Sequence, residues 1–254
     1  MVCERGTVVS LAVIASVAEA CLCVILIIVK IDPKILSGQI QDHIKWLENN
    51  KTGIHIEIAS PLNELQIAAK KEGFQLTVCS GFRNFESQLA LWNAKAVGAR
   101  PLLDKNSRRL DISKLSPEDI MFAILRWSAL PGLSRHHWGT DLDVYDRQAL
   151  PKDYQLQLIP QEFEGTGYFA PMHDWLDNNL SRFGFFRPFE KDLGGVSPER
   201  WHISYAPLAQ QYWKLLTLEH IRQVLTQVEF ELKTHVIKAL PEIYERFFQR
   251  ITPP

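Results

Sequence analysis

Cysteine is scarce in this sequence, and its placement excludes one kind of metal site. Three of the four cysteines, Cys3, Cys21 and Cys23, lie close to the N-terminus, and Cys79 is the single cysteine in the remaining chain. One thiol can form neither an intradomain disulfide nor a zinc–thiolate cluster. A metal site in that part of the chain must therefore use histidine and carboxylate ligands.

An excess of charge is also absent. Lysine and arginine number 28 and aspartate and glutamate 29, which gives a formal net charge of −1. A nucleic-acid partner needs a basic face that replaces phosphate counterions, so we expect none. With 254 residues, of which 46% are hydrophobic, the chain can form one large domain or two small ones.

The first 30 residues differ from the rest of the chain. The segment from Thr7 to Val29 carries one charged side chain, Glu19, and about 20 apolar residues span a bilayer as a helix. We expect residues 1–30 to be a membrane anchor in the cell envelope. Arg5, Lys30 and Lys34 are too few to set its orientation, and a domain facing the periplasm is expected only from the substrate inferred below. Two alternatives remain: a cleaved signal segment, or a mis-assigned start codon, in which case the protein would be cytoplasmic.

Residues 31–254 are predicted to form one mixed domain. Capping residues and apolar stripes predict helices at 43–50, 60–73, 84–96, 116–129 and 169–184, and a C-terminal helical region from Leu208 that Pro241 breaks. Alternating, β-rich segments predict strands at 74–80, 140–146 and 201–207. Because the helices and short strands do not alternate regularly, we expect an α+β fold.

The segment SRHHWGTDLDVYD, residues 134–146, gathers several metal-type side chains. On a helix, His136 and Asp143 would stand roughly 10 Å apart along the axis, too far for bonds of about 2 Å to one ion. A turn at Gly139 followed by a strand can bring Asp143 back beside His136. In such a strand Asp141 and Asp143 point to the same side.

A third ligand is available in PERWHISY, residues 198–205. His202 can complete the set, and Glu199 can lie beside the metal without binding it. Three protein ligands leave one position for a water molecule, whose pKa the metal lowers toward about 7. On these residues alone a simpler reading stays open, because most single histidines are surface or core residues and most aspartate-rich strand ends are solvated turns.

Three segments, in order along the chain, resemble the signature of the LAS metallopeptidases. Within that group they are similar to the VanY-type D-alanyl-D-alanine carboxypeptidase family. The segments are SGFRNFESQ at 80–88, similar to the family's S-G-Y/F-R-x-x-x-x-Q, then S-x-H-x-x-G-x-x-x-D from Ser134, and E-x-W-H from Glu199. The resemblance implies a LAS/Hedgehog-like fold, with a small, mainly antiparallel sheet flanked by helices and followed by a helical C-terminal segment.

The resemblance also implies roles for individual residues. The implied zinc ligands are His136, Asp143 and His202. Glu199 would act as general base on the zinc water and then as general acid toward the leaving amine. Arg83 would donate hydrogen bonds to the scissile carbonyl oxygen, where negative charge develops. Ser134 and Gln88 are weaker candidates for holding the substrate at its terminal carboxylate.

One residue departs from the family pattern, which often has a small residue, commonly alanine, at the position of Asp141. Asp141 could orient a ligand histidine or pair with a cationic group of the substrate. We therefore count it among the candidate substrate-binding residues. The expectation from sequence is that Asp141→Ala keeps stoichiometric zinc and changes substrate preference. The adjacent His137 is not expected to be a ligand.

The implied function is a zinc carboxypeptidase that hydrolyses a D-alanine-terminal peptide bond of peptidoglycan stem peptides or muropeptides. An L,D-carboxypeptidase or a wall-lytic endopeptidase could use the same zinc site, and the sequence separates these activities poorly. A non-catalytic wall-binding relative is a further alternative, since a fold does not fix a function. The presence of both Glu199 and Arg83 argues against that last alternative, because a binding protein would not need the base.

Overall fold

A four-stranded antiparallel sheet carries most of the segments singled out above. The structure, a computed structural model, describes residues 31–47 and 51–254. Its strands, in spatial order, are β3 Leu76–Ser80, β4 Asp141–Asp146, β6 His202–Tyr205 and β5 Phe185–Phe186. All neighbouring pairs are antiparallel. The predicted α+β class with a small antiparallel sheet is confirmed.

The register of the sheet places polar residues of the predicted motifs side by side. Asp143 of β4 pairs with His202 of β6, and Asp141 pairs with Ser204. On the other side of β4, Ser80 pairs with Asp143 after an irregularity in β3. Directly opposed residues have Cβ atoms about 5 Å apart, so the register by itself brings an aspartate and a histidine within reach of one ion.

The opposite face of the sheet forms the core. Leu142, Val144 and Ile203 are fully buried there. They pack against α3 Ala59–Lys71 and α7 Ala170–Asp177, which contribute Leu62, Leu65, Ala69, Met172 and Leu176. Alternation along β4 therefore sends aliphatic side chains toward the helices and Asp141 and Asp143 to the other face.

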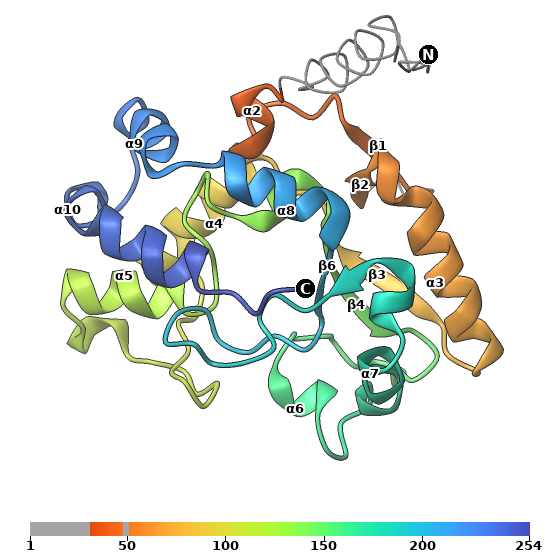
Figure 1. The fold of residues 1–254 in the computed structure, drawn as a ribbon. Helices are drawn as coiled ribbons and strands as arrows, with labels where there is room; N and C mark the ends of the chain where they lie inside the picture. The colour runs from red at the N-terminus through yellow and green to blue at the C-terminus, as the bar shows by residue number, and fades with distance from the viewer. Residues whose placement is uncertain (1–30, 48–50) are drawn as a thin grey trace, which may run out of the picture. The chain divides into compact units, whose positions relative to one another are not determined.

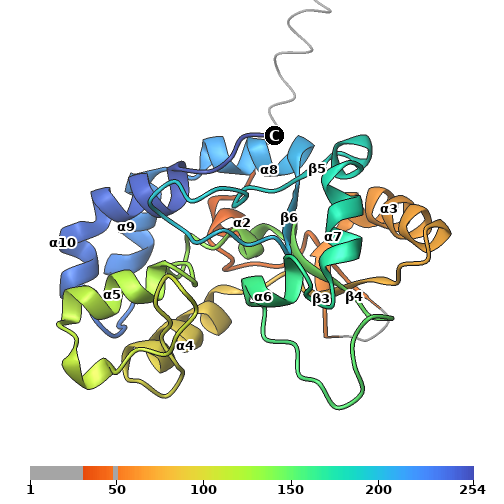
Figure 2. The same ribbon diagram turned by 90° about the horizontal axis from the view of Figure 1, so that it is seen from below.

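A group of helices lies on the other side of the sheet from α3 and α7 (Figures 1 and 2). It consists of α4 Phe85–Ala96, α5 Pro117–Leu125, α9 Leu218–Thr226 and α10 Lys233–Ile243, while α8 Ala206–Leu215 follows β6 directly. The shorter helices are α2 Pro33–Leu36 and α6 Pro160–Phe163. Ser116 and Asp119 form a capping box at the start of α5, which confirms the helix start predicted there.

The prediction of a helix at 43–50 is wrong for its described part. Residues Ile44–Trp46 form strand β1, which pairs with β2, Gly53–His55, in a two-stranded sheet. Ile44 is buried and packs closely against the backbone of Gly53. Only a glycine fits there, because a Cβ added at Gly53 would lie 2.6 Å from Ile44 Cγ2. Tertiary packing has overridden a weak local helix pattern.

The predicted break at Pro241 is also wrong. Pro241 lies inside α10, and the chain continues into the π-helical segment η5, Tyr244–Gln249. The helical region is instead interrupted earlier, between α8 and α9 and between α9 and α10, where Leu232 adopts a left-handed conformation with φ of 64°.

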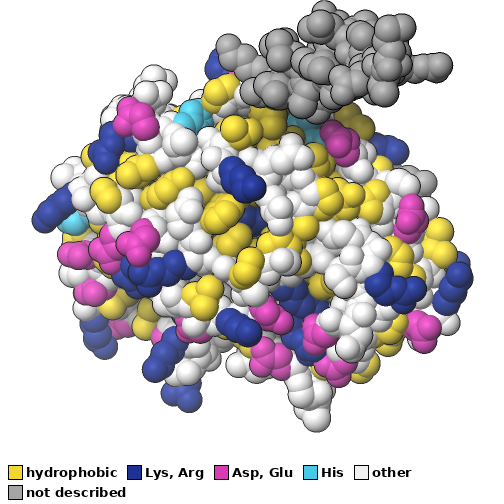
Figure 3. Space-filling view, in the orientation of Figure 1, with side chains coloured by type: hydrophobic (Ala, Val, Ile, Leu, Met, Phe, Trp, Pro, Cys, Tyr) yellow, Lys and Arg dark blue, Asp and Glu magenta, His cyan; other side chains and the backbone are white. Residues whose placement is uncertain are grey.

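The predicted membrane segment, residues 1–30, lies outside the described residues. In the part of the chain that the structure describes, no helix has both the length and the apolar character needed to cross a bilayer. Basic and acidic side chains are interspersed on the face drawn in Figure 3.

Candidate metal centre

His136 reaches the sheet through a tight turn at Gly139. His136 lies in the 3-10 helix η3, Arg135–Trp138, which ends at Gly139 with φ of 68°. A Cβ at Gly139 would lie 2.5 Å from Ile44 Cδ1 and 2.8 Å from the backbone nitrogen of His55. The turn thus needs both the left-handed conformation and the absence of a side chain. It returns the chain into β4, so that Asp143 comes back beside His136.

His136, Asp143 and His202 form a compact group of metal-type side chains. One atom from each lies within 4.8 Å of the others, and all three residues are buried. His136 Nε2 is 3.4 Å from Asp143 Oδ2, and His202 Nδ1 is 3.3 Å from Asp143 Oδ1. Atoms bound at about 2 Å to one tetrahedral ion lie about 3.3 Å apart, so the spacing fits a zinc-sized cation.

Hydrogen bonds fix which nitrogen of each imidazole faces the group. His136 Nδ1 is 2.9 Å from the carbonyl oxygen of Gly81, and His202 Nε2 is 2.9 Å from Asp141 Oδ1. Both partners can only accept, so these nitrogens carry the protons and the opposite nitrogens keep their lone pairs. His202 Nδ1 and Asp143 Oδ1 are buried without a hydrogen-bond partner, as expected of metal-ligand atoms.

The electrostatics of the group favour a cation. Burial lowers the pKa of His136 to about 4, so its ring is neutral at pH 7, as a ligand must be. Burial alone would also lower the pKa of His202, but its hydrogen bond to Asp141 and the negative charges of Asp141 and Asp143 raise that pKa to about 9. The two carboxylates therefore stabilise positive charge at this place, which a divalent metal would supply.

Glu199 lies beside the group rather than within it. Its carboxylate Oε2 is 3.6 Å from His202 Nδ1, and its side chain is 12% exposed. The loop before β6 positions it, because the backbone nitrogen of Glu199 donates to Phe189 and its carbonyl accepts from His202. Burial raises the pKa of Glu199 to about 7, while His202 opposes the rise and Asp143 adds to it. A carboxyl with such a pKa can both accept and release a proton near neutral pH.

Arg83 faces the same cavity from the loop after β3. Its backbone nitrogen donates to the carbonyl oxygen of His136 at 3.1 Å, which ties that loop to η3. Its guanidinium donates to Gln88 Oε1 at 2.8 Å and to Ser80 Oγ at 3.2 Å. The first and second motifs predicted from sequence thus converge on one site.

Comparison with known proteins agrees with this geometry. The family model described as VanY, D-alanyl-D-alanine carboxypeptidase, matches residues 51–208, more than half of the chain. This chain belongs to the VanY family. Family membership and the His-Asp-His group agree with the predicted VanY-type metallopeptidase.

Two relatives illustrate the range of similarity. A D-alanyl-D-alanine carboxypeptidase of Enterococcus faecalis is 27% identical over 173 residues, which cover 67% of this chain and 54% of the relative. An uncharacterized protein of Haemophilus influenzae is 47% identical over 79 residues, which cover 30% of this chain and 60% of the relative. The chain thus spans little more than half the length of these two relatives.

Solved structures of VanY proteins are also similar. VanYB in complex with D-alanine-D-alanine matches with a TM-score of 0.49 and 25% identity, covering 72% of this chain and 89% of that one. A mutant of the vancomycin resistance D,D-pentapeptidase VanY in complex with Zn(II) matches with a TM-score of 0.48 and 27% identity. The match covers 72% of this chain and 91% of that one.

Two residues that the sequence suggested for substrate binding, Gln88 and Asp141, are fully buried. Gln88 is fully buried, and its amide donates to the carbonyl oxygen of Ala129 at 2.6 Å while its oxygen accepts from Arg83. Asp141 is also fully buried, behind His202. The prediction that these two side chains bind substrate is therefore corrected. Gln88 holds Arg83 in place, and Asp141 contacts His202. Sequence pattern identified both positions but could not tell which way their side chains point.

Ser134 remains a predicted substrate-binding residue. It lines a cavity of about 60 Å³ together with Arg83, Glu199, His136 and His202. Its side chain makes no capping hydrogen bond to η3. The remaining wall of the cavity is mostly apolar and was not singled out from sequence. Its apolar members include Trp127, Phe189, Val196 and Phe247. Phe247 comes from η5. The amphipathic sequence pattern of this segment did not predict that Phe247 would line the cavity.

His137, the neighbour of His136, is not available to a metal. Its Nδ1 donates to the carbonyl oxygen of Arg83 at 2.6 Å, and its Nε2 accepts from the backbone nitrogen of Gly132 at 3.0 Å. Both ring nitrogens are used, so His137 serves to hold the loop that carries Arg83. His136, and not His137, is the histidine that lies with Asp143 and His202.

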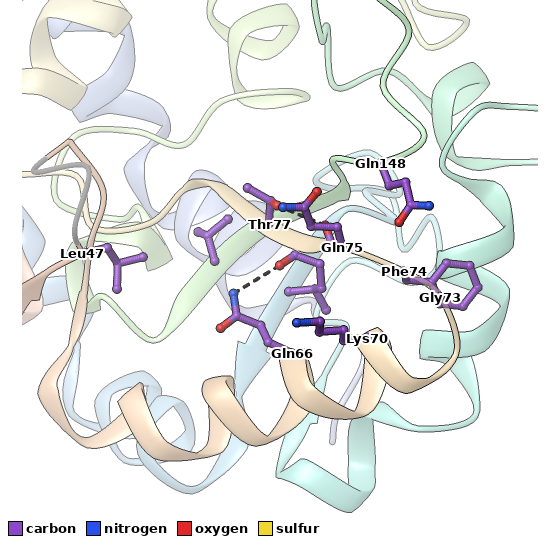
Figure 4. A pocket seen from close by; sticks show the side chains of 10 residues that line it. Leu47, Gln66, Lys70, Gly73, Phe74, Gln75, Thr77 and Gln148 are labelled. Atoms are coloured by element: carbon purple, nitrogen blue, oxygen red, sulfur yellow. Dashed lines mark hydrogen bonds between the residues drawn. The ribbon is translucent and has the colours of Figure 1, made fainter.

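A larger hollow, of about 680 Å³, lies away from this site (Figure 4). It is bordered by α3 and by the outer edge of β3, and Gln66 of α3 donates there to the carbonyl oxygen of Leu76 at 3.2 Å. None of the metal-type residues lines it. Its size alone gives no reason to place the chemistry there.

Proposed function

We propose that this chain is a zinc-dependent carboxypeptidase that removes the terminal D-alanine from peptidoglycan stem peptides. The observation that carries the proposal is the convergence of three ligand-type atoms within 4.8 Å, with Glu199 and Arg83 lining the same cavity. A bound zinc ion would be held by His136, Asp143 and His202, and would supply a Lewis acid and an acidified water molecule.

The protein's own groups account for the remaining chemistry. Glu199 takes the proton of the attacking water and passes it to the leaving amine, and burial favours this role because it raises the pKa of the carboxyl. The guanidinium of Arg83 donates to the scissile carbonyl oxygen as negative charge develops on it. Gln88 and Ser80 hold this guanidinium in place before the substrate arrives, so little reorganisation is needed.

The size of the cavity favours a small leaving residue. About 60 Å³ beside the catalytic groups holds a few water molecules or a methyl side chain. An endopeptidase would need room for chain on both sides of the cleaved bond, and the apolar wall that includes Phe189 and Phe247 restricts that room. We propose further that residues 1–30 anchor the enzyme in the cell envelope, where stem peptides of the mature wall occur.

Defined muropeptides test the activity. The full chain is incubated with a pentapeptide ending in D-alanyl-D-alanine, a tetrapeptide ending in an L,D bond and a cross-linked dimer, with and without chelator. Mass spectrometry should show loss of one alanine from the pentapeptide, abolished by chelator and restored by zinc. Preferential cleavage of the tetrapeptide or the dimer would assign the alternative activities, and no cleavage of any substrate would refute the proposal. Fractionation of the native protein, with its N-terminus sequenced, tests the location.

A further inference from the structure

A buried ion pair lies directly behind the ligand histidine His202. Arg135 Nε is 2.7 Å from Asp141 Oδ1, and both side chains are almost completely shielded from solvent. The same Oδ1 accepts from His202 Nε2 at 2.9 Å. Arg135 thus contacts Asp141, and Asp141 contacts the ring nitrogen of His202 that faces away from His136 and Asp143.

The carboxylate of Asp141 has no oxygen left for another partner. Its Oδ2 accepts from Thr140 Oγ1 at 2.8 Å and from Ser204 Oγ at 2.9 Å. Ser204 in turn accepts from Arg135 Nη2 at 2.8 Å. Each oxygen of Asp141 accepts from two donors. These donors belong to η3, to β6 and to Thr140 in the turn before β4, and together they hold Asp141 rigidly.

Geometry excludes Asp141 as a ligand of the same ion. A metal about 2 Å from His202 Nδ1 would lie about 4 Å from Nε2, on the opposite edge of the ring. Asp141 Oδ1 is a further 2.9 Å beyond Nε2. The two carboxylates therefore act from opposite sides of His202: Asp143 toward the metal position and Asp141 behind it.

The Arg135–Asp141 pair is not expected to add much to the stability of the fold. Removing two charges from solvent is costly, and replacing a buried pair by apolar residues of similar volume is often neutral or stabilising. A partner that only accepts hydrogen bonds, in contrast, forces the proton of His202 onto Nε2 and makes Nδ1 the lone-pair nitrogen. It also makes that nitrogen a more basic ligand.

From these contacts we infer that the Arg135–Asp141 pair is a positioning device for His202, which fixes its tautomer and its ring orientation and so increases zinc affinity. Arg135 pairs with Asp141 and keeps its carboxylate pointed at the ring, and Asp141 acts on the metal only through His202. The inference rests on the proposed zinc site. It replaces the expectation that Asp141 governs substrate preference, because Asp141 cannot reach a substrate.

Zinc affinity measured by chelator competition tests the inference. Asp141→Asn keeps the shape of the side chain and a hydrogen-bond acceptor but removes the charge, and should weaken zinc binding by about 10- to 100-fold. The single variant leaves Arg135 buried without its partner, which could prevent folding. The double variant Arg135→Gln/Asp141→Asn leaves no unpaired buried charge and should show the same loss of affinity.

A second readout and a matched control separate positioning from general stability. In the zinc-loaded protein, the ¹⁵N NMR signal of the His202 Nε2–H group should shift in both variants. The control is Arg187→Gln/Asp177→Asn, which removes another pair of a buried arginine, with an N–O distance of 2.9 Å. It should lower the unfolding midpoint of the metal-free protein and leave the zinc dissociation constant unchanged.

Each outcome bears on one claim. Unchanged zinc affinity in the folded double variant would overturn the positioning role. Complete loss of zinc from that variant at millimolar metal would also overturn it, since it would make one of the pair a ligand. Failure of the unsubstituted protein to bind zinc would instead refute the proposed function.

Discussion

At the scale of single residues, the candidate site separates groups that would touch the substrate from groups that hold them. Glu199 and Arg83 line the cavity, whereas Gln88, His137 and Asp141 are buried and each holds a group of the site. Motif spacing is enough to predict the first kind, because the chemistry dictates the residue types. It is not enough for the second kind, since Arg135 and Asp141 are recognisable as a pair only once β4 has folded against η3.

Substitution of Glu199 tests its proposed role in proton transfer. Glu199→Gln keeps the size of the side chain but cannot accept a proton, so kcat should fall by about 10²- to 10⁴-fold while one zinc ion per chain is retained. Kinetics on the pentapeptide and metal analysis of the purified variant check both parts. Glu190→Gln, an exposed glutamate of the same loop, is the control and should be fully active. Full activity of Glu199→Gln would refute the assigned role.

The pH dependence of the reaction should report the same residue. Burial raises the pKa of Glu199 from its ordinary value of 4.5 to about 7, and a nearby dication would lower it again. Glu199 must be ionised to accept a proton. We therefore expect kcat/KM to fall on the acid side, with an apparent pKa between these two values. A profile that stays flat down to pH 4 would contradict this assignment.

At the scale of elements, the turn from η3 into β4 assembles the site, and Gly139 is its critical residue. Gly139→Ala must adopt φ of 68° and displace Ile44 or the backbone at His55. We expect a loss of about 1–3 kcal/mol in the free energy of unfolding, together with weaker zinc binding as His136 shifts. Denaturant titration and chelator competition measure the two effects.

Gly73 provides the matched control for this substitution. Its φ is 88°, but an added Cβ would meet no atom within 4 Å. Gly73→Ala should therefore lose stability through backbone strain alone and leave zinc affinity unchanged. Equal loss of zinc affinity in both variants would argue against the turn as the element that aims His136.

The same scale shows where sequence patterns succeed and fail. The helices with capping signals, such as the one beginning at Pro117, and the strand Asp141–Asp146 follow from local chemistry. The segment at 44–46 does not, because its pairing with Gly53–His55 is decided by contacts that a local pattern does not contain. Pro241 misleads for a similar reason: packing of α10 against its neighbours outweighs the loss of one hydrogen bond.

At the scale of the whole molecule, the C-terminal helices complete a site whose motifs lie within residues 51–208. Phe247 contributes to the cavity wall. Arg246 donates to the carbonyl oxygen of Gly194, and the backbone nitrogen of Thr252 donates to Pro188, which fastens the loop that carries Glu199. We expect the C-terminal segment to limit which substrates enter.

Phe247→Ala tests this contribution. Removing the ring should enlarge the cavity and raise kcat/KM for a peptide ending in a bulkier residue, relative to one ending in D-alanine, by about 10-fold. Zinc content should not change, because Phe247 is not one of the three metal-type residues. An unchanged ratio of the two kcat/KM values would exclude Phe247 from substrate selection.

Anomalous diffraction at the zinc absorption edge, from crystals of the purified full chain, tests the central claim most directly. The account predicts one strong anomalous peak about 2 Å from His136 Nε2, from an oxygen of Asp143 and from His202 Nδ1. A zinc-supplemented crystal without a peak among these three atoms, or with its ion bound elsewhere, would contradict it.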